Sequence, residues 1–203
     1  MTILNGNYRE YKLDNGLVVA LQETLSQTIV GKLRVNYGAF HEQTDEKGYA
    51  HFLEHCLVSA GSAKYTPLQI EAISDSLGYF NASTSVGRTT FPMESLTEDL
   101  GLWLDLVSGF LFNPRFGTER VEGERGIVLR EIADHKSNPD YELSRSLTNA
   151  IARGHPTGIE ILGDSKSIAE ASVEKIKRFY ERGYTASNMD LILVGNLPKN
   201  VEE

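Results

Sequence analysis

The alternation of apolar and polar residues predicts strands near the N-terminus. Residues 8–23, "YREYKLDNGLVVALQE", hold two short alternating runs around an Asn-Gly pair, which is a strong β-hairpin signal. Residues 28–38 also alternate and predict a further strand. Residues 79–95 are rich in Thr, Phe and small residues, and predict two strands joined by a turn near Gly87.

Other segments show the helical period of 3.6 residues. Thr66 and Pro67 predict a helix start, with Thr66 as N-cap. Thr97 likewise predicts the cap of an amphipathic helix that Pro114 closes. The other predicted helices cover residues 48–61, 118–137, 139–152 and 165–183, and "NMDLILVGN" predicts a last buried strand.

This order of elements predicts an α+β fold: a largely antiparallel β-sheet with helices packed on one face. No internal repeat and no linker divides the chain, so residues 1–203 are expected to form a single domain. The uncovered face of such a sheet is expected to be apolar, which favours a partner.

Composition excludes several classes of function. The formal charge of −8 leaves no basic stripe for nucleic acid. The single cysteine, Cys56, cannot form an intrachain disulfide and is expected to be a small core residue, which favours a reducing compartment. The first residues lack a signal-peptide pattern, and no apolar run approaches the ~20 residues of a membrane span. We therefore expect a cytoplasmic protein without a membrane anchor.

The segment "GYAHFLEHCLVSAG", residues 48–61, places ionisable groups in a helix that otherwise resembles core. His51 and His55 are four residues apart and share a helix face, with Glu54 beside them. Two neutral imidazoles at this spacing can bind one Zn²⁺, and a neighbouring carboxylate can accept a proton from water. The H-x-x-E-H order reverses the commoner H-E-x-x-H zinc motif.

A hydrolytic zinc site uses a third protein ligand and an open fourth position. The predicted helix "ERVEGERGIVLREIADH" offers Glu124 and Glu131, seven residues apart and therefore on nearly the same face. Glu119 and Glu122 on the same helix are interpreted as solvated surface residues. The alternative for the histidines is a partly buried, hydrogen-bonded pair without a metal.

The chain resembles the inverzincin peptidases of the pitrilysin, insulinase and mitochondrial-processing-peptidase group. That family has H-x-x-E-H followed by a ligand glutamate seventy to eighty residues on, and here Glu131 follows His55 by 76 residues. Four further segments resemble family blocks in the same order: "LGYFNASTS", "GERGIVLREI", "GHPTGIEILGDSKSI" and "YTASNMDLILVGN". The resemblance implies a domain related in fold to LuxS and the processing peptidases.

The resemblance also implies roles for individual residues. The zinc ligands, one ion per chain, would be His51, His55 and Glu131. Glu54 would be the general base of a zinc-activated water, and Glu124 would orient a ligand histidine. An edge strand would accept the peptide substrate by strand addition, through Asn81, Ala82 and Ser83. His41, His135 and His155 are expected to be surface or loop residues.

Size separates this chain from the family pattern. Family members typically carry two homologous halves, and the second half contributes an Arg and a Tyr that contact the substrate carbonyl. The chain corresponds to one half. The first hypothesis is therefore a zinc endopeptidase that cleaves extended peptides, completing its site as a homo-oligomer or with a second-half partner. The second is a zinc-binding subunit without catalysis of its own.

Overall fold

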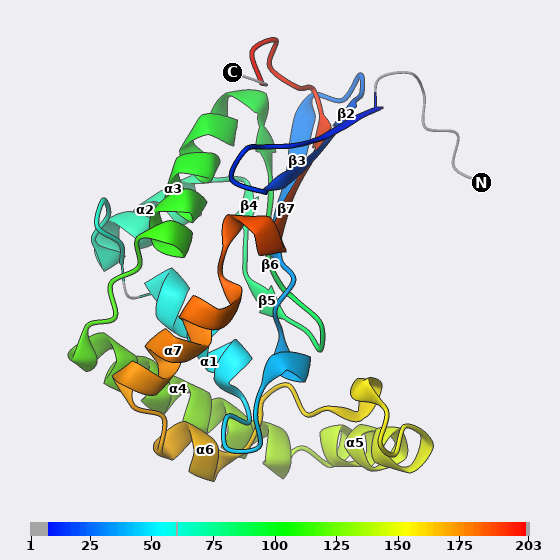
Figure 1. Ribbon diagram of the computed structural model, residues 1–203, viewed down its shortest axis with the longest axis vertical. Helices are drawn as coiled ribbons and strands as arrows, with labels where there is room; N and C mark the ends of the chain where they lie inside the picture. The colour runs from blue at the N-terminus through cyan, green and yellow to red at the C-terminus, as the bar shows by residue number, and fades with distance from the viewer. Residues whose placement is uncertain (1–7, 60, 202–203) are drawn as a thin grey trace.

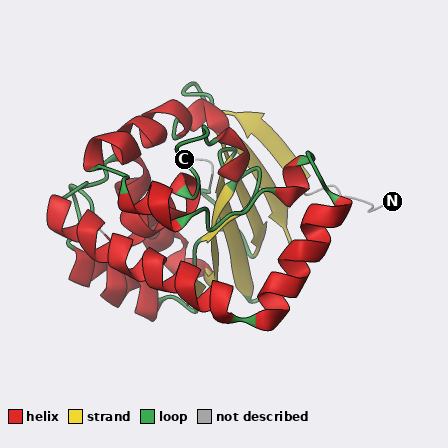
Figure 2. Ribbon diagram, turned by 90° about the horizontal axis from the view of Figure 1, so that it is seen from below, coloured by secondary structure: helices red, strands yellow, loops and turns green. Residues whose placement is uncertain are grey.

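The computed structural model describes residues 8–59 and 61–201. The first seven residues, part of the segment searched above for a leader sequence, lie outside this range. Strands and helices form two layers, with the helices gathered on one face of the sheet and α5 extending past its lower end (Figures 1 and 2). The strands are β1 (Tyr8–Lys12), β2 (Val18–Glu23), β3 (Thr28–Val35), β4 (Tyr79–Phe80), β5 (Ser83–Thr84), β6 (Thr89–Leu96) and β7 (Met189–Gly195). The helices are α1 (Tyr49–Ser59), α2 (Pro67–Ser76), α3 (Leu100–Phe112), α4 (Thr118–Ser137), α5 (Pro139–Ile151), α6 (Ser165–Ala169) and α7 (Val173–Gly183).

The described strands form one mixed sheet in the order β1-β2-β7-β3-β6-β4, with β5 also paired to β6. Each pairing is antiparallel except that of β2 with β7, which is parallel. The predicted α+β class with a largely antiparallel sheet is confirmed. The last strand, β7, therefore lies in the middle of the sheet, and β4 and β5 lie at one edge.

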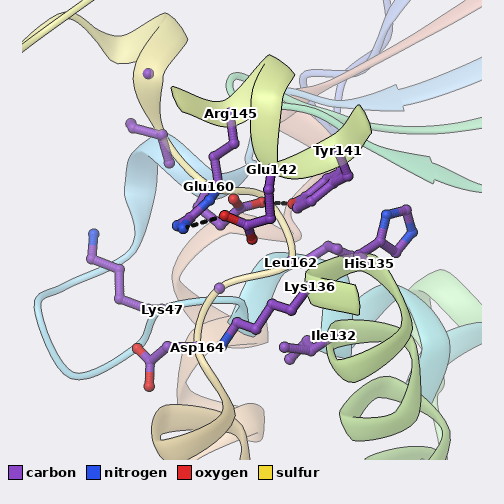
Figure 3. A pocket seen from close by; sticks show the side chains of 13 residues that line it. Lys47, Ile132, His135, Lys136, Tyr141, Glu142, Arg145, Glu160, Leu162 and Asp164 are labelled. Atoms are coloured by element: carbon purple, nitrogen blue, oxygen red, sulfur yellow. Dashed lines mark hydrogen bonds and ion pairs between the residues drawn. The ribbon is translucent and has the colours of Figure 1, made fainter. Parts of the chain in front are cut away.

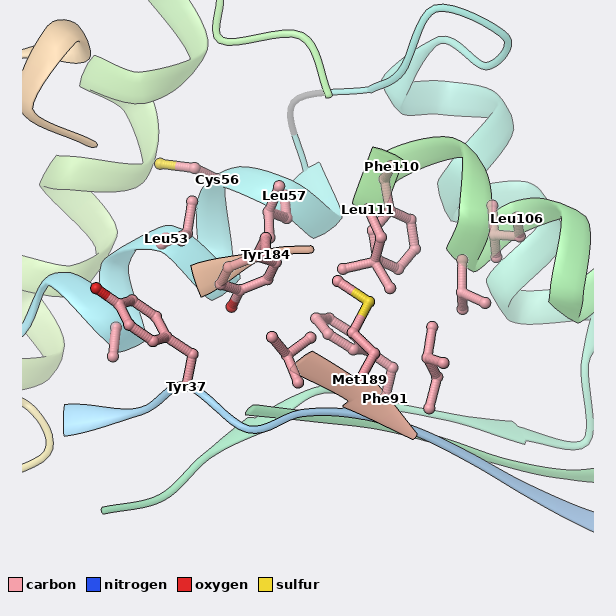
Figure 4. Close-up of a cluster of buried hydrophobic side chains, with 14 of the residues drawn as sticks. Tyr37, Leu53, Cys56, Leu57, Phe91, Leu106, Phe110, Leu111, Tyr184 and Met189 are labelled. Carbon is pink, nitrogen blue, oxygen red and sulfur yellow. The ribbon is translucent and has the colours of Figure 1, made fainter. Parts of the chain in front are cut away.

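The hydrophobic core fills the space between the sheet and the helices (Figure 4). Leu53 and Leu57 of α1 and Phe110 of α3 are fully buried in this core, where the ring of Phe110 packs on Phe91 of the sheet at 5.3 Å between ring centres. Cys56 is buried among them as expected, and burial raises the pKa of its thiol. Helix α1, which carries the histidines, is thus fixed by core packing on the side away from them.

Most predicted element boundaries agree with the structure. Thr66 caps α2 by accepting a hydrogen bond from the Gln69 backbone N–H. The predicted cap at Thr97 is wrong, because its hydroxyl donates instead to the Asn196 carbonyl at 2.7 Å. A short 3₁₀ turn, Thr97–Asp99, therefore precedes α3.

The face of the sheet that the helix layer leaves uncovered is mixed in character. Apolar residues Val30, Ile192 and Val194 lie on it beside charged residues of the same strands. Arg34 and Asp190 form an ion pair across β3 and β7. The expectation that this face is large and apolar is therefore wrong. Among the described residues, every helix is too short or too polar to cross a lipid bilayer.

The N-terminus of α1 is held by a carboxylate seven residues before its first residue. Glu42 accepts hydrogen bonds from the backbone N–H groups of Gly48 (3.0 Å) and Ala50 (2.9 Å). The segments of Gly48 and Gly163 also approach each other so closely that a Cβ on either glycine would meet backbone atoms of the other segment, at 2.5 Å and 2.3 Å. Both have positive φ, which glycine adopts without strain. These contacts fix the start of α1 against the 158–164 segment.

Replacing Glu42 by Gln is expected to change how stability depends on pH. Burial raises the pKa of Glu42 from its ordinary value of 4.5 to about 7 in the folded chain. Between pH 4.5 and about 7, Glu42 is protonated in the folded chain and ionised in the unfolded chain. The free energy of unfolding therefore falls as the pH rises through this range, by roughly 3 kcal/mol in total. Urea denaturation at pH 4.5 and 7.5 should show a smaller loss of stability in Glu42→Gln. If Glu42→Gln loses as much unfolding free energy between the two pH values as the unchanged chain does, the prediction is wrong. The exposed control Glu119→Gln is expected to behave like the unchanged chain.

Candidate metal centre

Helices α1 and α4 bring the three predicted ligands together. The Nε2 atoms of His51 and His55 lie 3.6 Å and 3.7 Å from the same oxygen, Oε2, of Glu131. One ligand atom from each residue lies within 4.8 Å of the others. The histidines are one turn apart on α1, and α4 packs against α1 so that Glu131 faces them. Glu131, which follows His55 by 76 residues in the sequence, therefore lies next to it in space.

These donor atoms fit a zinc ion. Separations of 3.6 Å and 3.7 Å are too long for hydrogen bonds. Ligands at the usual zinc distances of about 2.0–2.1 Å in a tetrahedral site lie roughly 3.3 Å apart. Burial and the neighbouring His55 and His135 lower the pKa of His51 to about 4. Its imidazole is thus neutral at physiological pH, which is the form that binds a metal.

Glu124 anchors the second histidine from the side away from Glu131. Its Oε2 lies 3.2 Å from His55 Nδ1, and its side chain is buried. Burial is the largest single cause for both groups and opposes their charge, but their hydrogen bond and the neighbouring polar and charged groups together outweigh it, so the pKa of His55 is raised and that of Glu124 lowered. A carboxylate bound to one ring nitrogen orients the other toward a metal. By contrast, His51 Nδ1 is buried without a hydrogen-bond partner in the described part of the chain.

Replacing Glu124 by Gln is expected to weaken zinc binding by about 10- to 100-fold, because His55 loses the charged acceptor that orients it. Competition with a chromogenic chelator measures this affinity directly. Glu119→Gln is the matched control, since Glu119 is exposed on the same helix. Equal zinc affinity in Glu124→Gln and in this control would contradict the orienting role.

Glu54 lies between the metal ligands and the edge of the sheet. It is 9% exposed, and burial raises its pKa. Its Oε2 accepts a hydrogen bond of 2.6 Å from the hydroxyl of Thr84 on β5. The sequence interpretation did not include Thr84, although it is the last residue of the "NAST" segment that carried the resemblance. A buried carboxylate with a raised pKa has the properties of a general base.

The predicted substrate residues border the same site. Ala82 and Ser83 line a cavity of about 360 Å³ together with His51 and Glu54. Asn81 and Ala82 line a second cavity, of about 190 Å³, with Glu54 and His55. Ser83 belongs to the edge strand β5, whereas Asn81 and Ala82 lie between β4 and β5. The metal ligands and Glu54 therefore stand beside an edge that a further strand can join.

His135 lies nearer the site than the sequence interpretation placed it. Its side chain is 43% exposed, and its Nε2 lies 4.0 Å from the second oxygen of Glu131. It also lines the cavity at Glu54. Beyond His135 and Tyr141, a further cavity of about 370 Å³ extends between α4, α5 and the 158–164 segment (Figure 3). Glu160 lines both of these cavities, which are therefore neighbours.

The H-x-x-E-H helix and the third carboxylate follow the pattern of the inverzincin peptidase family. The profile of the family described as Insulinase (Peptidase family M16) matches residues 18–165. The chain belongs to this family, and the resemblance stated from its motifs is confirmed.

Known proteins that resemble the chain are about twice its length or longer. A protein of Rickettsia bellii named as an uncharacterized zinc protease is 31% identical over 196 residues, covering 94% of this chain and 47% of that protein. A probable mitochondrial-processing peptidase subunit β of Arabidopsis thaliana is 29% identical, and the match covers 90% of this chain and 35% of that protein. The periplasmic protease PqqL from Escherichia coli superimposes with a TM-score of 0.89 at 22% identity, covering 97% and 23%. The chain therefore spans about half or less of each of them.

Proposed function

We propose that the chain is the metal-binding part of a zinc-dependent endopeptidase that hydrolyses extended or unfolded peptides. The observation that carries this proposal is the placement of Glu54 between three metal-ligand side chains and an open sheet edge. His51, His55 and Glu131 would hold one zinc ion. When bound, zinc polarises the substrate carbonyl and makes water a stronger nucleophile at neutral pH.

The chain's own residues supply proton transfer and orientation. Glu54 accepts the proton of the attacking water and then donates it to the leaving amine. Its low exposure limits competing contacts with solvent, and Thr84 fixes one carboxylate oxygen. Glu124 keeps His55 in the tautomer that leaves Nε2 free for the metal.

The substrate is proposed to bind as an added strand at the edge formed by β4 and β5. Backbone hydrogen bonds then hold the peptide in register beside Glu54, and side chains enter the cavities on either side. Only an extended segment can pair in this way, so folded proteins are poor substrates. Peptides and unfolded chains are the proposed substrate class.

A second candidate is a zinc-binding part that does not catalyse by itself. It is favoured by the length of the chain, which spans 47% of its Rickettsia relative. The family resemblance implies that an Arg and a Tyr of a second half contact the substrate carbonyl. In this case a second copy or a partner chain completes the site.

One experiment tests both candidates. The purified chain, analysed for metal and for mass in solution, is incubated with a quenched mixture of unstructured peptides. One zinc per chain, with cleavage that a chelator abolishes and zinc restores, supports the peptidase. One zinc per chain without cleavage supports the second candidate. Full cleavage after complete zinc removal contradicts both.

A further inference from the structure

The edge strand presents only some of its backbone groups to an incoming peptide. β4 and β5 keep one continuous register against β6. Antiparallel residues alternate between those bonded to the partner strand and those whose N–H and C=O point away. The backbone N–H groups of Asn81 and Ser85 donate inward, at 3.3 Å and 2.8 Å. Ala82 and Thr84 therefore direct their backbone groups to the free edge.

Ala82 and Thr84 differ in the backbone groups that they can offer to a peptide. The N–H of Ala82 already donates to the Asn81 side chain at 2.8 Å. Thr84 lies farther along the edge, next to Glu54, and its N–H and C=O are both directed outward by the register. Ser83, which the sequence interpretation assigned to substrate binding, pairs with Thr90 and turns its backbone inward.

The side chain of Thr84 points from this edge to the general base. Its hydroxyl carries a single proton, and that proton is donated to Glu54 Oε2 at 2.6 Å. A hydrogen bond to a charged, partly buried acceptor is short and directional, so it restricts the rotation of the carboxylate. One residue thus contacts both the site of peptide addition and Glu54.

We propose that Thr84 is a positioning residue that couples peptide binding to the orientation of Glu54. A peptide strand bonded to the backbone of Thr84 fixes β5, and the Thr84 hydroxyl then holds the carboxylate of Glu54 toward the water to be deprotonated. This inference rests on the proposed peptidase function, and it adds a residue that orients the base when an extended peptide is bound.

The test compares Thr84→Val, which keeps the shape and removes the hydroxyl, with Thr84→Ser, which keeps the hydroxyl. In the assembly that cleaves peptides, Thr84→Val is expected to lower kcat about 10- to 100-fold, which is part of the roughly 10²- to 10⁴-fold effect of a general base. KM and zinc content should stay close to those of the unchanged chain. Thr84→Ser should restore kcat. Thr90→Val, on the neighbouring strand, is the matched control.

Substrates in which one amide at a time is replaced by an ester test the coupling itself. In the unchanged chain, loss of the amide that donates to Thr84 should raise KM and lower kcat. In Thr84→Val the same ester should raise KM only, because the link to Glu54 is already absent. An equal loss of kcat in both backgrounds, or unchanged kcat in Thr84→Val, overturns the proposal.

A structural readout separates this inference from the proposed function. Crystal structures of the zinc-loaded Val and Ser variants should show the Glu54 carboxylate rotated in Thr84→Val and held in place in Thr84→Ser. If no assembly of the unchanged chain cleaves peptides, the proposed function fails. The orientation of the Glu54 carboxylate in the two crystal structures then decides by itself whether Thr84 positions it. The same Glu54 rotamer in both variants overturns the positioning role.

Discussion

Replacing Glu54 by Gln is expected to lower peptide hydrolysis by roughly 10²- to 10⁴-fold while leaving one zinc ion per chain. Gln has the shape of Glu and can still accept the Thr84 hydrogen bond, but its amide cannot take a proton from water. The zinc ligands are other residues, so the metal should remain. Steady-state cleavage of a quenched peptide and metal analysis of the same sample measure both effects.

The outcome separates a catalytic role of Glu54 from a structural one. Glu119→Gln, an exposed change on α4, should leave hydrolysis and zinc content unchanged. If Glu54→Gln cleaves at the rate of this control, another group is the base. If Glu54→Gln loses zinc as well as activity, the residue acts through the metal site and the assignment as base is wrong.

Replacing Glu131 by Ala is expected to have the largest effect on metal binding. The change removes one of three ligand side chains, so zinc affinity should fall by more than the roughly 10- to 100-fold predicted for Glu124→Gln. Zinc at 100 times its dissociation constant stabilises a folded chain by about 2.7 kcal/mol. A thermal shift on adding zinc should therefore be clear in the unchanged chain and much smaller in Glu131→Ala.

This measurement does not depend on catalysis, so it holds for either candidate function. The zinc-free forms of both proteins should unfold at similar temperatures, because Glu131 is only half-buried and packs at the surface of α4. A zinc-induced shift of equal size in Glu131→Ala would show that the metal binds elsewhere or through the histidines alone.

The parts of this structure that local sequence encodes were predicted well. The Asn15-Gly16 turn, the cap at Thr66 and the period of residues 118–137 all depend on neighbours within a few positions. The candidate metal ligands were predicted because His51 and His55 share one helix face and the family motif supplied Glu131. Their convergence on one oxygen needed the packing of α4 on α1, which local patterns do not give.

The residues that the sequence analysis missed act through contacts that only the folded chain creates. Thr84 contacts Glu54 across 30 positions, and only the fold brings them together. Glu42 resembles any charged loop residue until α1 is placed with its N–H groups toward it. Thr97 fits a cap pattern, but the Asn196 carbonyl, 99 positions away, competes for its hydroxyl. Tertiary contacts override local preference at such positions.

The central place of β7 also determines when the sheet can form during folding. β7 pairs with both β2 and β3, from which it is separated by more than 150 positions. Pairing over such distances is slow, because the loop-closure entropy is lost before the contacts form. A nascent chain that has not yet exposed residue 189 can build the hairpin β1–β2, the pairing of β3 with β6 and several helices, but not the complete sheet. The complete sheet against which α1 packs is therefore a late product of folding, made only after the last strand enters between two early ones.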